Sequence, residues 1–251
     1  MRVAAIDCGT NTLRLFVGTL DADGFLRELD RRLTFVGLGE GVDATGRFAP
    51  DALRRAFRAC EQYAEIIADL DCSRTRFVAT SATRDAVNRE EFFAGVRARM
   101  GIEPEVISGV EESELSFAGA VNGIRCPRNP VLVMDSGGGS TELVRGTAAC
   151  CQDSVTAVER GVSIDVGSRR LRERILHGDP PTAGEVGEAR ELVRHQLDGA
   201  GLDLGGIGSF IGVAGTVTSM TALALRLRRY DRARVHGAAM GAAAVHRVAE
   251  R

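Results

Sequence analysis

Two short segments combine an aspartate with glycine and hydroxyl residues directly after an apolar run. They are Asp7-Cys-Gly-Thr-Asn-Thr12 and Asp135-Ser-Gly-Gly-Gly-Ser-Thr141. A turn of this composition gathers backbone N–H groups that bind anions, most often phosphate, and its glycines let the ligand approach the backbone closely. An aspartate beside a phosphate requires a cation between them, and Mg²⁺ held by one or two carboxylates with phosphate oxygens and waters meets that requirement. The segments predict two phosphate-binding turns, each preceded by a metal-binding aspartate.

The same pattern occurs once in each half of the chain, which suggests an internal duplication. An alignment without gaps of Asp7 over Asp135, an offset of 128 residues, places Gly9 on Gly137. Chance similarity between two β-hairpins is the alternative interpretation. The predicted phosphate ligands are the residues of the two turns: Gly9, Thr10, Asn11 and Thr12 in the first half, and Gly137, Gly138, Gly139, Ser140 and Thr141 in the second.

The two copies differ at one informative position, because Arg14 in the first aligns with Glu142 in the second. If the halves face each other across a cleft, one carries a cation for phosphate and the other a second carboxylate for metal or water. That asymmetry suits phosphoryl transfer, in which catalysis is mostly positioning and charge neutralisation. Arg14 therefore joins the predicted phosphate ligands.

Two further segments follow apolar runs and contain residues that can bind an anion. Arg84 lies in Ala79-Thr-Ser-Ala-Thr-Arg-Asp-Ala-Val-Asn88 and is either a phosphate clamp or an ordinary solvated arginine. Gly215 and Thr216 lie in Gly212-Val-Ala-Gly-Thr-Val-Thr-Ser219, directly before an expected helix. They either hold phosphate at the helix N-terminus or form a simple turn into a core helix. The residues alone leave both alternatives open.

A further acidic pair lies at the expected start of a helix. Ser108-Gly-Val-Glu111 fits a capping box, with Ser108 as N-cap and Glu111 at the third helical position, which gives Glu111 a structural role. Glu112 follows in the first turn, where the positive end of the helix keeps a carboxylate ionised and able to accept a proton from water. Spacing alone favours the simpler interpretation, in which these glutamates lie on an exposed helix start and have no catalytic role.

The elements that must position these residues alternate between strands and helices, which indicates an α/β fold. The segment Asn122–Pro130 is rich in helix-breaking residues, so we expect a domain junction there. The expected strands lie at 3–7, 12–20, 76–80, 106–108 and 131–135, and the expected helices lie after Pro50, around 92–100 and around 115–121.

The composition narrows the class of protein. Of the 251 residues, 44% are hydrophobic, which is enough to bury a core. All 32 basic residues are arginine and the net charge is −2, so phosphate contacts must use guanidinium or backbone N–H groups, and nucleic-acid binding is not expected. The six cysteines show no metal-binding spacing, and no signal peptide or membrane span appears. We expect a cytoplasmic protein with reduced thiols and no membrane partner.

Four motifs together resemble the Ppx/GppA family of exopolyphosphatases and guanosine pentaphosphate phosphohydrolases. They are Ile6–Leu15, Ala79–Asn88, Ile107–Ser113 and Met134–Leu143, in the family's order. The resemblance implies two similar actin-like, ribonuclease-H-like lobes of the actin/Hsp70/sugar-kinase superfamily, with a cleft between them. The first lobe, at 1–124, would hold the first phosphate loop and the catalytic glutamate. The second, at 125–251, would hold the other loop.

The resemblance also implies roles for individual residues. Glu112 matches the family's proposed general base, which reverses the interpretation from spacing, and Glu142 is expected to assist it. Asp135 and Glu142 match the Mg²⁺ side of the site, with Mn²⁺ as a substitute, and Asp7 is added from its place before the first turn. The two turns match two phosphate loops, and Arg84 matches a contact to the phosphate chain.

The implied activity is Mg²⁺-dependent hydrolysis of the terminal phosphoanhydride of inorganic polyphosphate, releasing orthophosphate, in a homodimer. Hydrolysis of guanosine pentaphosphate (pppGpp) is the alternative, because both substrates present the same terminal anhydride. An ATP-using kinase or ATPase of the same superfamily and a non-catalytic sensor of polyphosphate or alarmones are the remaining hypotheses. Short members of the family extend past the point that matches Arg251, so we expect the second lobe to be incomplete at its C-terminus.

Overall fold

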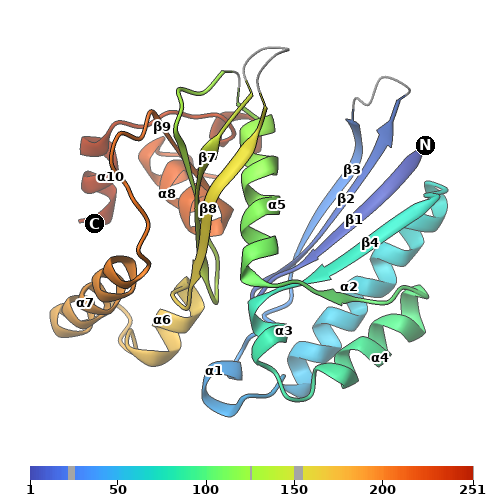
Figure 1. Cartoon of the computed structure of the whole chain (residues 1–251). Helices are drawn as coiled ribbons and strands as arrows, with labels where there is room; N and C mark the ends of the chain where they lie inside the picture. Colours follow the sequence, from blue (N-terminus) through green and yellow to red (C-terminus); the bar gives the residue numbers. More distant parts are fainter. Residues whose placement is uncertain (22–25, 125, 150–154, 251) are drawn as a thin grey trace. The chain divides into compact units, whose positions relative to one another are not determined.

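The computed structural model describes residues 1–21, 26–124, 126–149 and 155–250. Contacts between residues divide the chain into two compact units, each with its own mixed sheet (Figure 1). The first unit is formed by Met1–Ser108 with Arg169–Pro181, and the second by Gly109–Ser168 with Thr182–Arg251. This division differs from the expected lobes at 1–124 and 125–251, because the helix at Gly109–Asn122 packs on strands of the second sheet.

The first unit contains a five-stranded sheet in the order β3-β2-β1-β4-β5. β2 pairs antiparallel with both β1 and β3, whereas β4 pairs parallel with β1 and β5 parallel with β4. The strands are β1 (Arg2–Cys8), β2 (Thr12–Leu20), β3 (Leu26–Phe35), β4 (Arg74–Ala79) and β5 (Glu105–Val106). The helices are α1 (Val42–Thr45), α2 (Pro50–Asp69), α3 (Ser81–Asp85), α4 (Arg89–Met100) and α6 (Ser168–Arg174), whose residues from Arg169 onward belong to this unit.

One face of the first sheet forms the core with α2 and α4 (Figure 1). Side chains alternate between the two faces along a strand, and in β2 Leu13, Leu15 and Val17 are fully buried in this core. Asp7 and Arg14 occupy the intervening positions of β1 and β2, directly opposite each other in register. The aspartate before the first turn therefore lies on the face that α2 and α4 leave uncovered.

The second unit contains a four-stranded sheet in the order β8-β7-β6-β9. β6 and β7 form an antiparallel hairpin, β8 continues it, and β9 runs parallel to β6. The strands are β6 (Val131–Ser136), β7 (Thr141–Thr147), β8 (Ala157–Ile164) and β9 (Ser209–Val213). The helices are α5 (Gly109–Asn122), α7 (Ala183–Gly199), α8 (Ala214–Ala224), α9 (Arg232–Val235) and α10 (Ala242–Ala249).

Helix α5 covers the face of the second sheet that carries the site described below. Phe117 of α5 packs with Val133 and Val144 in the core of this unit. Because side chains on one face recur every second residue, Asp135 on β6 and its partner Glu142 on β7 lie on this same face. The second aspartate is thus under a helix, whereas the first is not covered by the helices of its own core.

The two hairpins repeat in structure as they do in sequence, which confirms the predicted duplication. Strands β3-β2-β1-β4 and β8-β7-β6-β9 have the same order and directions. Asp7 pairs with Arg14 in the first sheet, and Asp135 pairs with Glu142 in the second. The strand pairing of each sheet also shifts its register at the corresponding place. The shift lies between Val17 and Gly18 in the first sheet and between Arg145 and Gly146 in the second.

The predicted strands and helices of the first 135 residues are confirmed with shifted ends, and the α/β class is correct. β3, β8, α6 and α7 were not predicted. Among the residues that the structure describes, no helix is both long and apolar enough to cross a membrane. Cys8, Cys60 and Cys72 are free thiols, whereas Cys150 and Cys151 lie outside the described residues.

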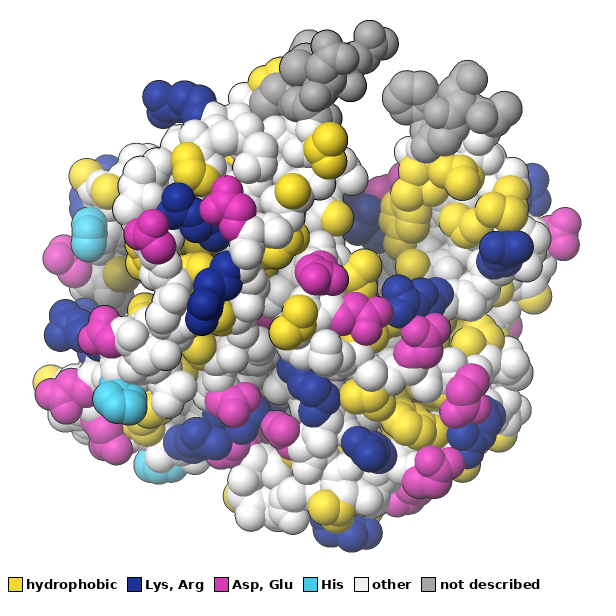
Figure 2. Space-filling view, in the orientation of Figure 1, with side chains coloured by type: hydrophobic (Ala, Val, Ile, Leu, Met, Phe, Trp, Pro, Cys, Tyr) yellow, Lys and Arg dark blue, Asp and Glu magenta, His cyan; other side chains and the backbone are white. Residues whose placement is uncertain are grey.

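Charged side chains of both signs are mixed on the face drawn in Figure 2. Exposed pairs such as Arg76 with Glu105 and Arg97 with Glu103 contribute little to stability, because water screens both partners.

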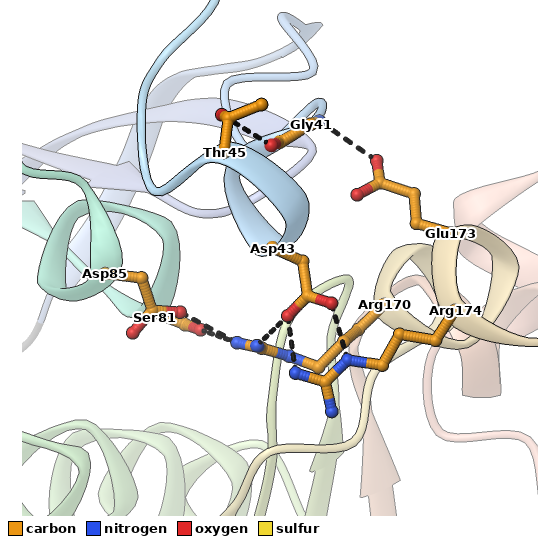
Figure 3. Close-up of polar contacts among 8 residues, drawn as sticks. All are labelled: Gly41, Asp43, Thr45, Ser81, Asp85, Arg170, Glu173 and Arg174. Carbon is orange, nitrogen blue, oxygen red and sulfur yellow. Dashed lines mark hydrogen bonds and ion pairs between the residues drawn. The ribbon is translucent and has the colours of Figure 1, made fainter.

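A less exposed group of charges fastens α6 to the rest of the first unit (Figure 3). Asp43 accepts hydrogen bonds from both Arg170 and Arg174. Arg170 also pairs with Asp85 of α3 at 2.8 Å, and its side chain is only 10% exposed. The hydrogen bond from Arg174 and the charge of Arg170 hold the pKa of Asp43 below its ordinary value, against the opposing effect of burial. The Asp43 carboxylate of α1 thus accepts hydrogen bonds from two arginines of α6 and holds the two helices together.

Replacement Asp43→Asn should lower the free energy of unfolding by about 1–3 kcal/mol at neutral pH, because two guanidinium groups lose their charged acceptor. Since the folded-state pKa of Asp43 is lowered, its stabilisation is present above the ordinary aspartate pKa and is lost as the pH falls through the lowered value. Urea denaturation should therefore show the difference from wild type shrinking below about pH 4.

The matched control is Asp51→Asn, which removes an exposed pair with Arg54 and should change the free energy of unfolding by less than about 0.5 kcal/mol. Equal effects of the two substitutions would contradict the role assigned to Asp43.

Candidate active site

The glycine-rich turn of the second unit joins β6 to β7. The Gly137 N–H donates to the Ser140 carbonyl at 3.0 Å, and the Ser168 N–H donates to the Gly137 carbonyl at 3.0 Å. Gly167 packs directly on the turn, because a Cβ added there would lie 2.4 Å from the Gly138 carbonyl group. No side chain fits in that space, so residues 167 and 168 support the turn by backbone contact.

Two carboxyl groups lie side by side on the strands that flank this turn. Asp135 and Glu142 are directly opposite in register, and Glu142 is 2% exposed. The Ser163 hydroxyl of β8 donates to Glu142 Oε1 at 2.8 Å, and the Ser116 hydroxyl of α5 donates to Asp135 Oδ2 at 2.6 Å. Each carboxyl therefore has a serine that fixes its orientation.

The first turn of α5 approaches the same strands closely. A Cβ added to Gly109 would lie 2.7 Å from Ser163 Cβ, and one added to Gly161 would lie 3.0 Å from Ser113 Cβ. Glycine at both positions lets the helix start sit against β8. Glu112 lies in that first turn and is half-buried. The helix begins directly after Ser108, as the capping box requires, while the bonds of the box stay a prediction.

Crowding of negative charge perturbs Glu142. Burial, followed by the charges of Glu112 and Asp135, raises the pKa of Glu142 from an ordinary 4.5 to about 7. Hydrogen bonds from Ser163 and Ser140 favour the ionised carboxylate and oppose this rise. The site therefore holds either a proton on Glu142 or a negative charge that a cation would stabilise.

The donor set of the second unit fits a hard divalent cation. In the described part of the chain, no three or more His, Cys, Asp and Glu side chains are grouped to hold a metal ion. Mg²⁺ needs fewer protein ligands, because waters and substrate phosphate complete its shell. A cation at Asp135 and Glu142 would relieve their repulsion. Asp7 belongs to the other unit, with Arg14 Nη1 at 3.5 Å from its Oδ2, so the predicted three-residue set is not assembled within one unit.

The turn of the first unit has the same internal bond as the second. The Gly9 N–H donates to the Thr12 carbonyl at 3.0 Å. Residues 36–39 brace the turn from outside, because the N–H groups of Val36 and Gly37 donate to the Asn11 carbonyl at 3.0 and 2.9 Å. The Gly39 N–H donates to the Thr10 carbonyl at 2.8 Å. This turn is held in shape before any ligand binds.

The remaining predicted ligands lie in two helices, α3 and α8. Arg84 of α3 donates from Nη1 to the Ile107 carbonyl at 3.0 Å, which uses one of the five N–H donors of its guanidinium. Gly215 and Thr216 were expected to precede a helix. They lie instead inside the first turn of α8. The helix begins at Ala214, which has a left-handed φ of 68° directly after β9.

The structure thus assembles the predicted residues as two sets, one in each unit. The second unit brings together Glu112, Asp135 and Glu142 with the turn at 137–141. The first holds the turn at 9–12 with the Asp7–Arg14 pair. Sequence interpretation missed Ser116, Ser163 and Arg169. Ser116 lies four residues after Glu112, so helical spacing could have revealed it, whereas Ser163 belongs to an unpredicted strand.

Comparisons with known proteins agree on one family. The model of the Ppx/GppA phosphatase family matches residues 20–244. Exopolyphosphatase 2 of Mycobacterium tuberculosis is 46% identical over 245 residues, covering 94% of this chain and 74% of that protein. The crystal structure of an exopolyphosphatase-like protein is also 46% identical, with a TM-score of 0.85, over 91% of this chain and 70% of that one. A Ppx/GppA family member from Aquifex aeolicus is 30% identical, with a TM-score of 0.78, over 98% and 77%.

The raised pKa of Glu142 predicts a pH dependence of stability in protein freed of divalent cations. Between the ordinary pKa of 4.5 and the folded-state value of about 7, the folded protein keeps a proton that the unfolded chain has lost. The contribution of Glu142 is therefore greatest below the lower value and is lost as the pH rises through the upper one. Urea denaturation in EDTA should show a fall of about 2–3 kcal/mol between about pH 5 and pH 8.

Glu142→Gln should flatten this fall, because the amide does not ionise. Glu114→Gln, which changes an exposed carboxyl on α5, should leave it intact. A fall that persists in Glu142→Gln would show that another group causes it.

Proposed function

We propose that this chain, which belongs to the Ppx/GppA phosphatase family, is an exopolyphosphatase that releases orthophosphate from the end of inorganic polyphosphate. Family membership makes the chain a phosphoanhydride hydrolase. The name of the M. tuberculosis relative supports polyphosphate as the substrate. The observation that carries the proposal is the buried Glu142 carboxyl, crowded by Glu112 and Asp135 beside a glycine-rich turn.

Phosphate binding is assigned to each turn within its own unit. The backbone N–H groups at 137–141, with the hydroxyls of Ser140 and Thr141, would bind phosphate in the second unit, and the turn at 9–12 would bind phosphate in the first. Arg14 and Arg84 would add guanidinium contacts, which suit phosphate because the planar fork can donate two parallel hydrogen bonds. The chain has no lysine, so among its long basic side chains only arginine can attract the phosphate chain at long range.

The metal is proposed to bind at Asp135 and Glu142. When bound there, Mg²⁺ or Mn²⁺ would supply positive charge to neutralise phosphate oxygens. Ser116 and Ser163 then act through the carboxylates, because their hydroxyls hold the two groups at fixed orientations. Binding of the metal ion at this site would favour the ionised form of Glu142.

Water activation is assigned to Glu112. A water oxygen forms a bond to the terminal phosphorus while Glu112 accepts one of its protons, and the bridging P–O bond breaks. The bonding electrons leave on the shortened chain. Glu112 suits this role because it lies at the positive end of α5, beside the carboxylates but on a separate element. Glu142 is proposed to orient the same water. A cytoplasmic location and a homodimer stay predictions.

Glu112→Gln should lower kcat for polyphosphate with Mg²⁺ by about 10²-fold or more, because the amide cannot accept the proton. The measurement is orthophosphate release at saturating substrate. Glu114→Gln, on the exposed side of the same helix, is the control and should retain wild-type turnover. Unchanged turnover in Glu112→Gln would remove the role assigned to this residue.

A comparison of substrates separates polyphosphate from pppGpp, which presents the same terminal anhydride. We expect kcat/KM to be higher for polyphosphate than for pppGpp. We also expect it to rise with the length of the polyphosphate, as long as each added phosphate contacts a further arginine. The measurement is kcat/KM on polyphosphates of several lengths and on pppGpp. A preference for pppGpp would reassign the substrate, and tight binding without hydrolysis would indicate a sensor.

A further inference from the structure

Arg169, the first residue of α6 within the first unit, contacts the phosphate turn of that unit through a side chain. Its Nε donates a hydrogen bond to Asn11 Oδ1. Asn11 is one of the residues to which phosphate binding is assigned above, so the inference rests on the proposed function. Neither the turn motif nor its spacing predicts this arginine, which lies 158 residues further along the chain.

The contact fixes which end of the Asn11 amide is presented to a ligand. An asparagine side chain has an oxygen that only accepts and an NH₂ group that only donates, whereas a guanidinium only donates. The atom facing Arg169 must therefore be the oxygen, and the donor group Nδ2 becomes the other end of the amide. An anion is bound by donors, so this orientation is the one that phosphate requires.

Arg169 is itself held before a ligand binds. Its Nη1 lies 3.4 Å from Glu173 Oε1 within α6, and Glu173 Oε1 also accepts the Gly41 N–H at 3.2 Å. Figure 3 shows the hydrogen bond from Gly41 to Glu173 beside the pairs that fasten the same helix through Asp43. A Cβ added to Gly37, whose φ is +58°, would lie 3.3 Å from Arg169 Nη2. The absence of a side chain at Gly37 thus leaves room for the guanidinium.

We propose that Arg169 is a positioning residue that orients the Asn11 amide with its Nδ2 donors toward the phosphate ligand. Its effect on anion binding passes through Asn11 and not through a contact of its own with the anion. Preorganisation of this kind raises affinity, because the ordering of the amide is complete before binding.

The test is a double-mutant cycle on orthophosphate, the reaction product, whose binding is measured by calorimetry without turnover. Arg169→Met, which keeps the length of the stem and removes every donor, should weaken orthophosphate binding about tenfold. Asn11→Ala should weaken it at least as much. In the Asn11→Ala background, Arg169→Met should add less than about twofold, because the residue through which it acts is gone.

Arg172→Met is the matched control, since it removes one positive charge from the same helix. Arg172 donates instead to the Leu176 and Gly178 carbonyls, and its replacement should leave orthophosphate affinity within about twofold of wild type. Thermal unfolding checks that each variant folds, and Arg169→Leu, which also lacks a donor, replaces Arg169→Met if the latter does not.

Two results would overturn the proposal. One is an unchanged affinity in Arg169→Met. The other is an equal loss with and without Asn11, which would mean that Arg169 acts on the anion by itself. Hydrolysis is measured separately on the wild type, so a protein that binds orthophosphate but releases none from polyphosphate refutes the exopolyphosphatase function and leaves the cycle interpretable. A wild type that binds no orthophosphate refutes the inference.

Discussion

A carboxyl group buried among other carboxyl groups is the constraint on which the second unit depends. Glu142 is 2% exposed, and burial together with Glu112 and Asp135 raises its pKa to about 7. A protein that only needed to fold would place an apolar residue there, because burying an unpaired charge is costly. Ser163 and Ser140 reduce this cost without removing it. The arrangement makes physical sense for a site that takes up a cation and an anion together.

The duplicated hairpin shows how one backbone can serve two purposes. Both copies place an aspartate one residue before the end of a strand, close the turn with an N–H to carbonyl bond of 3.0 Å, and place the next strand in the same register. The residue opposite the aspartate is arginine in the first unit and glutamate in the second. The Asp7–Arg14 pair is neutral and would leave guanidinium donors for phosphate, whereas the Asp135–Glu142 pair would attract a cation. A single position therefore differentiates the two proposed roles.

The sequence was sufficient for the hairpins, because strand alternation and the Asp-x-Gly turns are local signals. The role of Glu112 as general base came only from the resemblance, since helical spacing alone favoured an exposed glutamate, and it stays a prediction. The contacts that orient the site were not predictable in the same way. Ser163 reaches Glu142 from β8, whose exposed, charged sequence gave no strand pattern, and Arg169 reaches Asn11 across 158 residues. Such contacts depend on tertiary packing, on which periodicity carries no information.

Calorimetric titration of Mg²⁺ near pH 6, in two buffers of different ionisation enthalpy, tests the central claim most directly. A cation that binds at Glu142 must displace the proton that this carboxyl holds below its pKa of about 7. We predict release of nearly a full proton for each Mg²⁺ bound, and loss of that release in Glu142→Gln. Binding of Mg²⁺ without proton release, or release that is unchanged in Glu142→Gln, would contradict the account.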